Sequence, residues 1–251
     1  MINYKNKYYC IYGMNSCSLF LAVKNTYKIK SLYLRKDSLA YKNKLINDLI
    51  LEQKILVNII GRKEYFNKFN FKHTQGIVIE FSGIIEKKIE ESLKVGNTSC
   101  YIIADQIKDP QNLGQIIRTC ECAGIDGIIL PKHKSVHLTN TVLQVSQGAF
   151  LLVDIFIENN LVNSINFLKD NGYWIIGVEN SISAKKWFDM DYQDKTAVVI
   201  GSEGDGIRRL VKESCDFLAT IPMKGKIDSL NVSAALSAVV FERQRQLEIN
   251  K

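Results

Sequence analysis

Apolar residues along the chain fall into short runs that alternate with segments of helical spacing. In the first third, YYCIYG, SLYLR, ILVNII and GIVIEF have the length and composition of strands. From residue 100 onward, more strongly apolar runs such as CYIIAD, GIILP and AVVIG return in the same alternation with helical segments. Continuous apolar strands that alternate with helices indicate a buried parallel sheet. We therefore expect a C-terminal α/β domain, with a mostly parallel sheet and helices on both faces, after a small N-terminal α/β unit.

The stretch between these two patterns is short and charged. Residues 82–98 contain no aromatic residue and include a glycine near their end. This composition is typical of a linker or a peripheral helix. The sequence thus predicts an N-terminal domain over residues 1–81, a linker over 82–98 and a second domain over 99–251.

The last apolar segment follows a loop that contains a proline and a glycine. Residues 221–242 are IPMKGKIDSLNVSAALSAVVFE, and from Val232 the segment is apolar on nearly every face. Such a segment predicts a buried helix, whose first turn presents unpaired N–H groups and the positive end of its dipole to the preceding loop. Taken alone, the stretch is equally consistent with a core helix that Ser229 caps.

The net charge of +7 is unevenly distributed along the chain. Residues 1–76 contain 14 Lys and Arg against 4 Asp and Glu, whereas the remaining 175 residues contain 19 against 22. A basic unit beside a nearly neutral remainder is typical of a module that binds nucleic acid. A Lys-rich solvated surface is the alternative interpretation.

Several classes of protein are disfavoured by the composition. No apolar run reaches the length of a membrane span, and MINYKNKYYC lacks the apolar core of a signal peptide. Six cysteines without a CxxC pair predict neither a disulfide framework nor a zinc site, so we expect a cytoplasmic protein.

His133 and His137 have the spacing of metal ligands, but they follow Pro131 in a Lys-rich loop without an acidic partner. We expect no metal there.

Three polar loops follow predicted strands, at the sheet edge where open α/β proteins bind ligands. The first, residues 109–114, leads to Arg118; the second is GSEGDG, residues 201–206; the third covers residues 221–231. The second loop has neither the GK[ST] of a phosphate-binding loop nor the GxGxxG order of a dinucleotide fingerprint. Since Glu203 would repel phosphates, we expect an uncharged or cationic ligand in a pocket lined by backbone.

Together, these loops resemble the signature motifs of the SpoU/TrmH-type ribose 2′-O-methyltransferases of the SPOUT superfamily. The resemblance runs from DPQNLGQIIRTCECAG through VIGSEGDGI to IPMKGKIDSLNVSAALSAVVFE. The N-terminal part, with YCIYGMNS and HTQG, is similar to the accessory RNA-binding domain of bacterial enzymes that methylate a guanosine ribose in 23S ribosomal RNA. One departure is Cys120, where relatives commonly have alanine.

The resemblance implies S-adenosylmethionine as the methyl donor, a C-terminal trefoil knot, and a homodimer with its sites at the subunit interface. The positions that match the cofactor-binding motif are Gly201, Ile221, Met223 and Leu230. The positions that match the polar active-site residues are Asn112, Arg118, Glu203, Ser229 and Asn231.

Methyl transfer from a sulfonium to a ribose 2′-hydroxyl requires an aligned oxygen that loses its proton. Arg118 keeps its own proton, so we expect it to orient the RNA and to stabilise the developing alkoxide. Our hypothesis is a ribosomal-RNA ribose methyltransferase, with transfer RNA as the nearest alternative substrate. A non-catalytic RNA-binding assembly factor is disfavoured by the intact polar positions, and a nucleotide-dependent oxidoreductase by the missing dinucleotide fingerprint.

Overall fold

The chain forms two compact units in the computed structural model, which describes residues 8–23, 27–70, 73–83, 85–94, 96–181, 184–192 and 194–249. The smaller unit contains the residues up to Ile85 and, from much later in the chain, Leu138–Leu151. The larger unit contains Glu86–His137 and the residues from Leu152 onward. Contacts therefore group residues 138–151 with the N-terminal unit, although the strand and helix pattern predicts them within the C-terminal domain.

The smaller unit is built on a four-stranded sheet with the order β1-β4-β2-β3. The elements of its N-terminal part are β1 (Tyr8–Tyr12), α1 (Met14–Ala22), β2 (Lys28–Arg35), α2 (Lys44–Glu52), β3 (Val57–Ile60), α3 (Arg62–Lys68) and β4 (Ile77–Ser82). Strands β1 and β2 pair antiparallel with β4, and β3 is parallel to β2. Helix α2 begins at Lys44, because the side chain of Asn43 accepts a hydrogen bond from the Ile46 N–H and caps the helix there.

Strand β1 lies at an edge of this sheet, and side-chain amides bind its outer backbone groups. Gln144, in α6 (Asn140–Val145), accepts a hydrogen bond from the Tyr12 N–H at 3.1 Å and donates one to the Tyr12 carbonyl at 3.0 Å. Asn140 accepts from the Cys10 N–H at 2.9 Å. These amides occupy backbone groups that an edge strand would otherwise offer to another strand.

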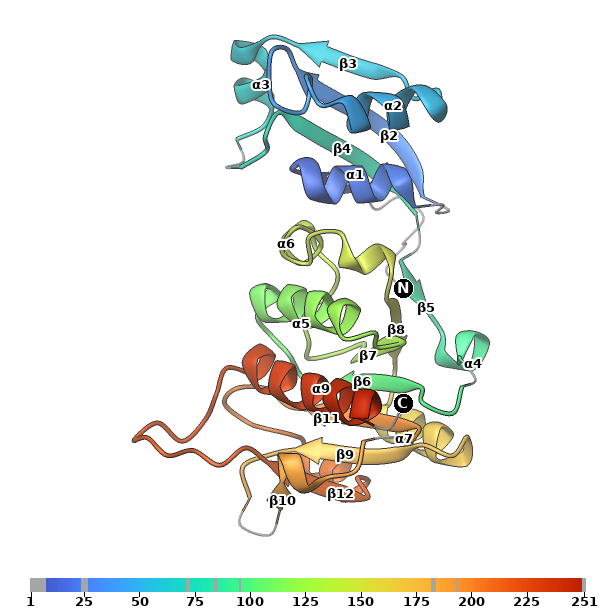
Figure 1. The fold of residues 1–251 in the computed structure, drawn as a ribbon, viewed down its shortest axis with the longest axis vertical. Helices are drawn as coiled ribbons and strands as arrows, with labels where there is room; N and C mark the ends of the chain where they lie inside the picture. Colours follow the sequence, from blue (N-terminus) through green and yellow to red (C-terminus); the bar gives the residue numbers. More distant parts are fainter. Residues whose placement is uncertain are drawn as a thin grey trace. The chain divides into compact units, whose positions relative to one another are not determined.

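The larger unit contains an eight-stranded sheet with the order β10-β12-β9-β11-β6-β7-β8-β5 (Figure 1). Its strands are β5 (Glu86–Lys87), β6 (Cys100–Ala104), β7 (Gly127–Pro131), β8 (Asp154–Glu158), β9 (Trp174–Val178), β10 (Lys185–Lys186), β11 (Thr196–Ile200) and β12 (Phe217–Thr220). Its helices are α4 (Ile89–Ser92), α5 (Pro110–Cys122), α7 (Leu161–Asp170), α8 (Arg209–Glu213) and α9 (Val232–Ile249). All pairings between these strands are parallel, which confirms the expected parallel α/β architecture.

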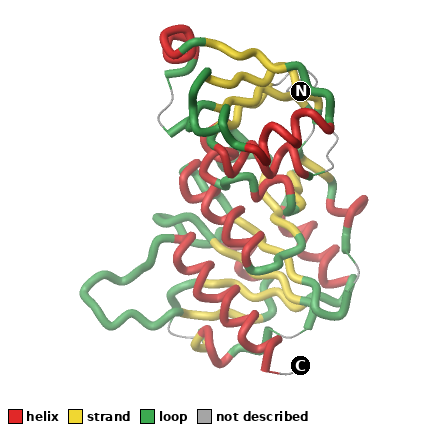
Figure 2. Tube along the Cα trace, turned by 45° about the horizontal axis from the view of Figure 1, so that its top comes forward, coloured by secondary structure: helices red, strands yellow, loops and turns green. Residues whose placement is uncertain are grey.

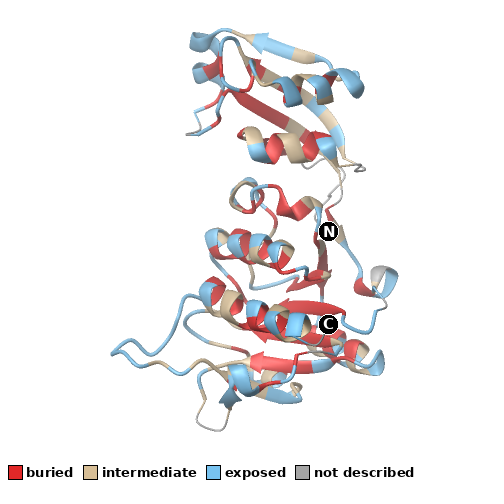
Figure 3. Ribbon diagram, viewed as in Figure 1, coloured by how far each residue is buried: buried red, intermediate tan, exposed pale blue. Residues whose placement is uncertain are grey.

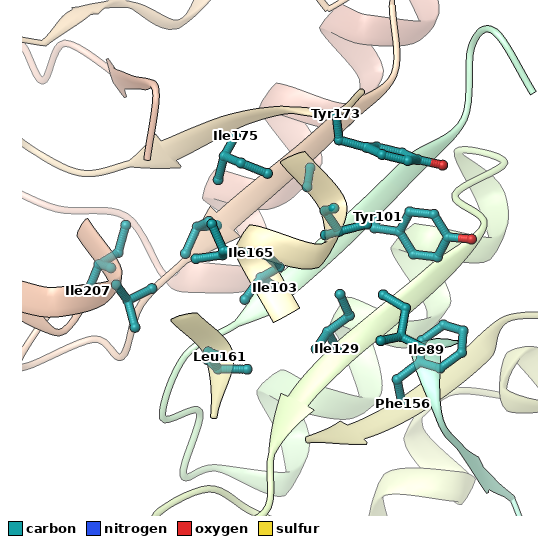
Figure 4. Packing of buried hydrophobic residues seen from close by; sticks show 14 residues of the cluster. Ile89, Tyr101, Ile103, Ile129, Phe156, Leu161, Ile165, Tyr173, Ile175 and Ile207 are labelled. Atoms are coloured by element: carbon teal, nitrogen blue, oxygen red, sulfur yellow. The ribbon is translucent and has the colours of Figure 1, made fainter. Parts of the chain in front are cut away.

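One face of this sheet packs against α4, α7 and α8 through a continuous apolar cluster (Figure 4). The ring of Tyr101 meets that of Tyr173 edge-on, with ring centroids 5.6 Å apart. Both hydroxyls are bonded: Tyr101 accepts from the Lys94 N–H at 2.8 Å, and Tyr173 donates to Ser99 Oγ at 2.7 Å. The core thus buries aromatic surface without leaving these polar atoms unpaired.

Helices α5 and α9 lie side by side on the opposite face of the sheet (Figures 1 and 2). Cys120 is fully buried on the inner side of α5, and this burial raises the pKa of its thiol well above the usual range. Cys120, the residue at which the chain departs from the family pattern, therefore packs in the protein interior. Exposed residues follow the outer sides of both helices (Figure 3). Among the residues placed by the structure, no helix is long and apolar enough to cross a bilayer.

Replacing Gln144 with alanine should loosen strand β1, because both hydrogen bonds to the Tyr12 backbone are lost. We expect the free energy of unfolding to fall by about 1–3 kcal/mol and the Tyr12 amide to exchange faster in hydrogen-exchange NMR. Asn140→Ala is the matched control, since it removes only the hydrogen bond to the Cys10 N–H and leaves both bonds between Gln144 and Tyr12 in place. Unchanged Tyr12 exchange in the alanine variant would contradict the role given to α6.

Candidate active site

A cavity of about 450 Å³ opens where strands β9, β11 and β12 end. The loops after these strands and the first turn of α9 supply its lining, at the carboxyl edge where parallel sheets bind ligands. The long loop of residues 221–231 extends away from the sheet between β12 and α9 (Figure 2). The residues expected in the site that line the cavity are Gly201, Glu203, Ile221, Met223, Ser229 and Leu230.

The loop after β11 turns back on itself in very little space. Ser202 and Gly206 exchange two backbone hydrogen bonds, of 3.1 and 3.0 Å. A Cβ atom on Gly201 would lie 2.1 Å from the carbonyl carbon of Gly206, far inside any allowed contact. Gly206 itself adopts a φ of 65°, in the left-handed region that favours glycine. Only glycine fits at position 201, and bare backbone borders the cavity as a result.

A buried carboxylate holds the end of this loop. Asp105 directly follows strand β6 and is fully buried. It accepts hydrogen bonds from the backbone N–H and from Nε of Arg208, at 2.9 and 2.8 Å, and it forms an ion pair with Nη2 at 2.7 Å. These bonds offset the cost of burying the charge and tie the loop to β6. The motif resemblance did not point to Asp105; its only signal in the sequence is an acidic residue at the end of an apolar strand.

Three of the expected polar residues form one hydrogen-bonded cluster. Glu203 Oε1 accepts from Nδ2 of Asn112 at 2.6 Å and from Nδ2 of Asn231 at 2.7 Å. Asn231 Nδ2 also lies 2.9 Å from Asn112 Oδ1. The cluster joins α5, the loop after β11 and the start of α9, and no described residue donates a hydrogen bond to Glu203 Oε2. One oxygen of an oriented carboxylate is therefore available to a ligand.

The start of α9 corrects one interpretation of the sequence. Asn231 Oδ1 accepts a hydrogen bond from the Ser233 N–H at 2.9 Å, so Asn231 caps the helix and Ser229 does not. Ser229 lies exposed in the loop, where its hydroxyl donates to Asp228 Oδ1 at 3.3 Å.

Arg118 is not among the residues that line the cavity, and it has no hydrogen bond to the cluster in the described structure. It is exposed, past the middle of α5. Six residues separate it from Asn112, which is buried, so the two side chains point to different sides of the helix. Arg118 forms no ion pair with any residue that the structure describes.

The cavity is acidic rather than neutral. Among the residues that the structure describes, its lining includes four carboxylates, those of Glu179, Glu203, Asp205 and Asp228, and no lysine or arginine. Glu179 and Asp205 each pair with a lysine that is not part of the lining, at 2.9 and 3.2 Å. Of the two expected ligand types, this charge favours the cationic one.

The two histidines considered for a metal do not form part of such a site. His133 is exposed, and His137 Nδ1 is buried without a hydrogen-bond partner in the described structure. Within the described ranges, no group of three or more His, Cys, Asp or Glu side chains is arranged to hold a metal ion.

Gly201→Ala should destabilise the protein, because the new methyl group collides with rigid backbone at Gly206. Overpacking of this kind costs about 1–3 kcal/mol of unfolding free energy, measured by urea denaturation. Gly204→Ala is the matched control in the same loop, since a Cβ there meets nothing within 4 Å. Equal losses in the two variants would show that the close approach at Gly201 is not the cause.

Two family models match the chain. Residues 99–241 match the SpoU rRNA Methylase family, and residues 10–84 match a family described as RNA 2′-O ribose methyltransferase substrate binding. The first match covers more than half of the chain and spans the cavity, the cluster and every strand of the parallel sheet except β5. The resemblance carried by the three motifs is thereby confirmed.

Similar proteins agree in sequence and in fold. The chain is 39% identical over 213 residues to a TrmH-family protein of Staphylococcus haemolyticus, covering 80% of this chain and 83% of that protein. It is 31% identical over 239 residues to the TrmH-family protein YacO of Bacillus subtilis, covering 94% and 95%. The fold is similar to that of the SpoU methyltransferase AviRb from Streptomyces viridochromogenes in complex with the cofactor AdoMet, with a TM-score of 0.80, 19% identity and coverage of 97% and 92%. This chain belongs to the SpoU rRNA methylase family of RNA methyltransferases.

Proposed function

We propose that this protein transfers a methyl group from S-adenosylmethionine to the 2′-hydroxyl of a ribose, of a guanosine in 23S ribosomal RNA. The observation that carries the proposal is the acidic, backbone-lined cavity that adjoins a carboxylate held by two asparagines. The carboxylates attract a sulfonium cation, and the adjacent cluster supplies a hydrogen-bond acceptor for a hydroxyl group.

The cofactor occupies the cavity in this proposal, and S-adenosylmethionine supplies the methyl group. Gly201 offers backbone groups that no side chain covers, while Ile221, Met223 and Leu230 add apolar surface to the lining. Two solved structures of similar fold, AviRb and an rRNA methyltransferase from Sinorhizobium meliloti, contain bound AdoMet. They support this choice of ligand.

Glu203 has the principal role at the hydroxyl. Asn112 and Asn231 both donate to Oε1, so they hold the carboxylate in one orientation and leave Oε2 to accept the hydroxyl proton or a hydrogen bond from it. Ser229 lies exposed at the edge of the same cavity, where its hydroxyl can contact the RNA. Asn112 and Asn231 therefore position the carboxylate of Glu203 and take no part in the proton transfer themselves.

We also propose that the protein forms a homodimer whose interface completes the site, and that its C-terminal domain contains a trefoil knot. Several apolar residues of α9 and of the loop before it are exposed in the single chain: Phe241 is 49% exposed, Leu230 45% and Ile227 76%. Exposed apolar surface of this kind is typical of an interface. Arg118 is exposed and does not line the cavity of its own chain, so we infer that it stabilises the developing alkoxide in the site of the partner subunit.

The RNA is bound in part by the smaller unit. Its basic composition and its match to a substrate-binding family support this role. The relatives in Staphylococcus haemolyticus and Bacillus subtilis are described as acting on tRNA or rRNA, so transfer RNA stays the alternative substrate. A non-catalytic assembly factor has no physical need for the asparagine–glutamate cluster, which disfavours that alternative.

The proposal is tested with the pure protein and total RNA from a strain that lacks it. We expect calorimetry to show binding of S-adenosylhomocysteine and none of NAD, and ribose-methylation mapping to find one modified site in 23S RNA. Glu203→Gln should slow methyl transfer by about 100-fold or more and change the dissociation constant of S-adenosylhomocysteine less than twofold. If the wild-type protein binds S-adenosylhomocysteine and methylates only transfer RNA, the proposed substrate is wrong and the proposed reaction stands.

Mixing two inactive variants tests whether Arg118 acts across the dimer. Arg118→Ala and Glu203→Gln should each be inactive alone. After unfolding and refolding together in equal amounts, they should recover about a quarter of wild-type activity, because half the dimers are mixed and each of these has one intact site. No recovery, in a mixture shown to contain mixed dimers, would assign Arg118 to the site of its own chain.

A further inference from the structure

Three hollows at the carboxyl edge of the larger sheet are joined by shared residues. The cofactor cavity shares Glu203 and Asp205 with a smaller hollow of about 210 Å³, which Asn112 and Lys108 also line. That hollow shares Lys108 and Asp205 with an open one of about 590 Å³, to which Lys134 contributes. The three hollows therefore lie next to one another, in the order cofactor cavity, hollow beside the asparagine–glutamate cluster, and hollow lined by two lysines.

The outermost hollow is positioned by a firmly attached loop. The carbonyl of Ile107 accepts hydrogen bonds from Ser135 Oγ at 2.8 Å and from the Val136 N–H at 2.7 Å. These bonds hold the loop after β7 against the segment that leads into α5. Lys134 and Lys108 consequently line one hollow, although they belong to different loops.

The charges in this hollow are easily rearranged. Lys108 Nζ pairs with Asp205 Oδ2 at 3.2 Å, but the two side chains are 66% and 68% exposed, so the pair is screened and contributes little to stability. Lys134 is exposed and forms no ion pair with a described residue. A phosphate can therefore take Lys108 away from Asp205 at little cost and gain a second ammonium group.

We propose that this lysine-lined hollow binds the phosphate next to the ribose that is methylated; this inference rests on the function proposed above. The 2′-hydroxyl and the 3′-phosphate of a nucleotide are attached to neighbouring carbons of one ring. A site that presents the hydroxyl to Glu203 must therefore accommodate a phosphate close by. Lys108 lines the small hollow that adjoins the cluster and also the outer hollow, where Lys134 joins it; among the described residues these are the only lysines of the two linings. They fix the register of the RNA strand, while Glu203 and the cofactor carry out the chemistry.

The test uses Lys108→Ala, Lys134→Ala and the double variant in the full chain. Both lysines are exposed, so folding should be unaffected, which a thermal melt checks. Each single change should raise KM for the RNA about tenfold, with kcat and the dissociation constant of S-adenosylhomocysteine within twofold of wild type. Each should also lower the slope of log KM against log salt concentration by about 0.7, the value for one phosphate contact with a single strand.

The controls separate local binding from general charge. Lys195→Ala removes the same charge beside the start of β11, at the opposite edge of the sheet, and should leave KM unchanged. Lys108→Arg keeps the charge and should therefore retain most of the wild-type affinity for RNA. If the wild type methylates RNA and both alanine variants keep its KM and salt slope, the inference is wrong and the proposed function stands. If the wild type neither binds S-adenosylhomocysteine nor methylates RNA, both are overturned.

Discussion

The hydrogen bonds at Glu203 join parts of the chain that lie far apart in the sequence. Asn112 and Asn231 are 119 positions apart, and both donate to the same carboxylate oxygen. Asn112 is buried, so moving any of the three segments leaves a buried amide without its partner. The cavity keeps its shape because α5, the glycine-rich loop and α9 meet at this point.

Two further constraints support that arrangement from within the loop. Gly201 lets the backbone approach Gly206 so closely that no side chain fits between them. Asp105 binds three groups of Arg208 and so fixes where the loop leaves the sheet. A rigid loop presents bare backbone and oriented carboxylates to a ligand without having to rearrange when the ligand binds.

The division into two units shows that a segment can make its contacts with a part of the chain that is distant in the sequence. Helix α6 follows β7 in the chain, and the Thr139 side chain caps it. Its partners nevertheless lie in β1, more than 130 positions earlier, where Gln144 binds the Tyr12 backbone. Nothing in the residues around Gln144 indicates this pairing, since it depends on an exposed sheet edge formed elsewhere.

Apolar spacing and turn residues determined the strands, the apolar helix that follows the last loop and the parallel α/β class, because these depend on residues a few positions apart. The three loops also predicted the candidate site, since glycine at 201 and the asparagines at 112 and 231 are chemically demanding positions. Only the tertiary structure decided that the cavity is acidic, that Asp105 holds Arg208, and that Arg118 is exposed and does not line the cavity of its own chain. The first two properties arise from groups on separate elements: the four carboxylates come from three loops between residues 179 and 228, and Asp105 and Arg208 are 103 positions apart. The third depends on which face of α5 packing leaves exposed.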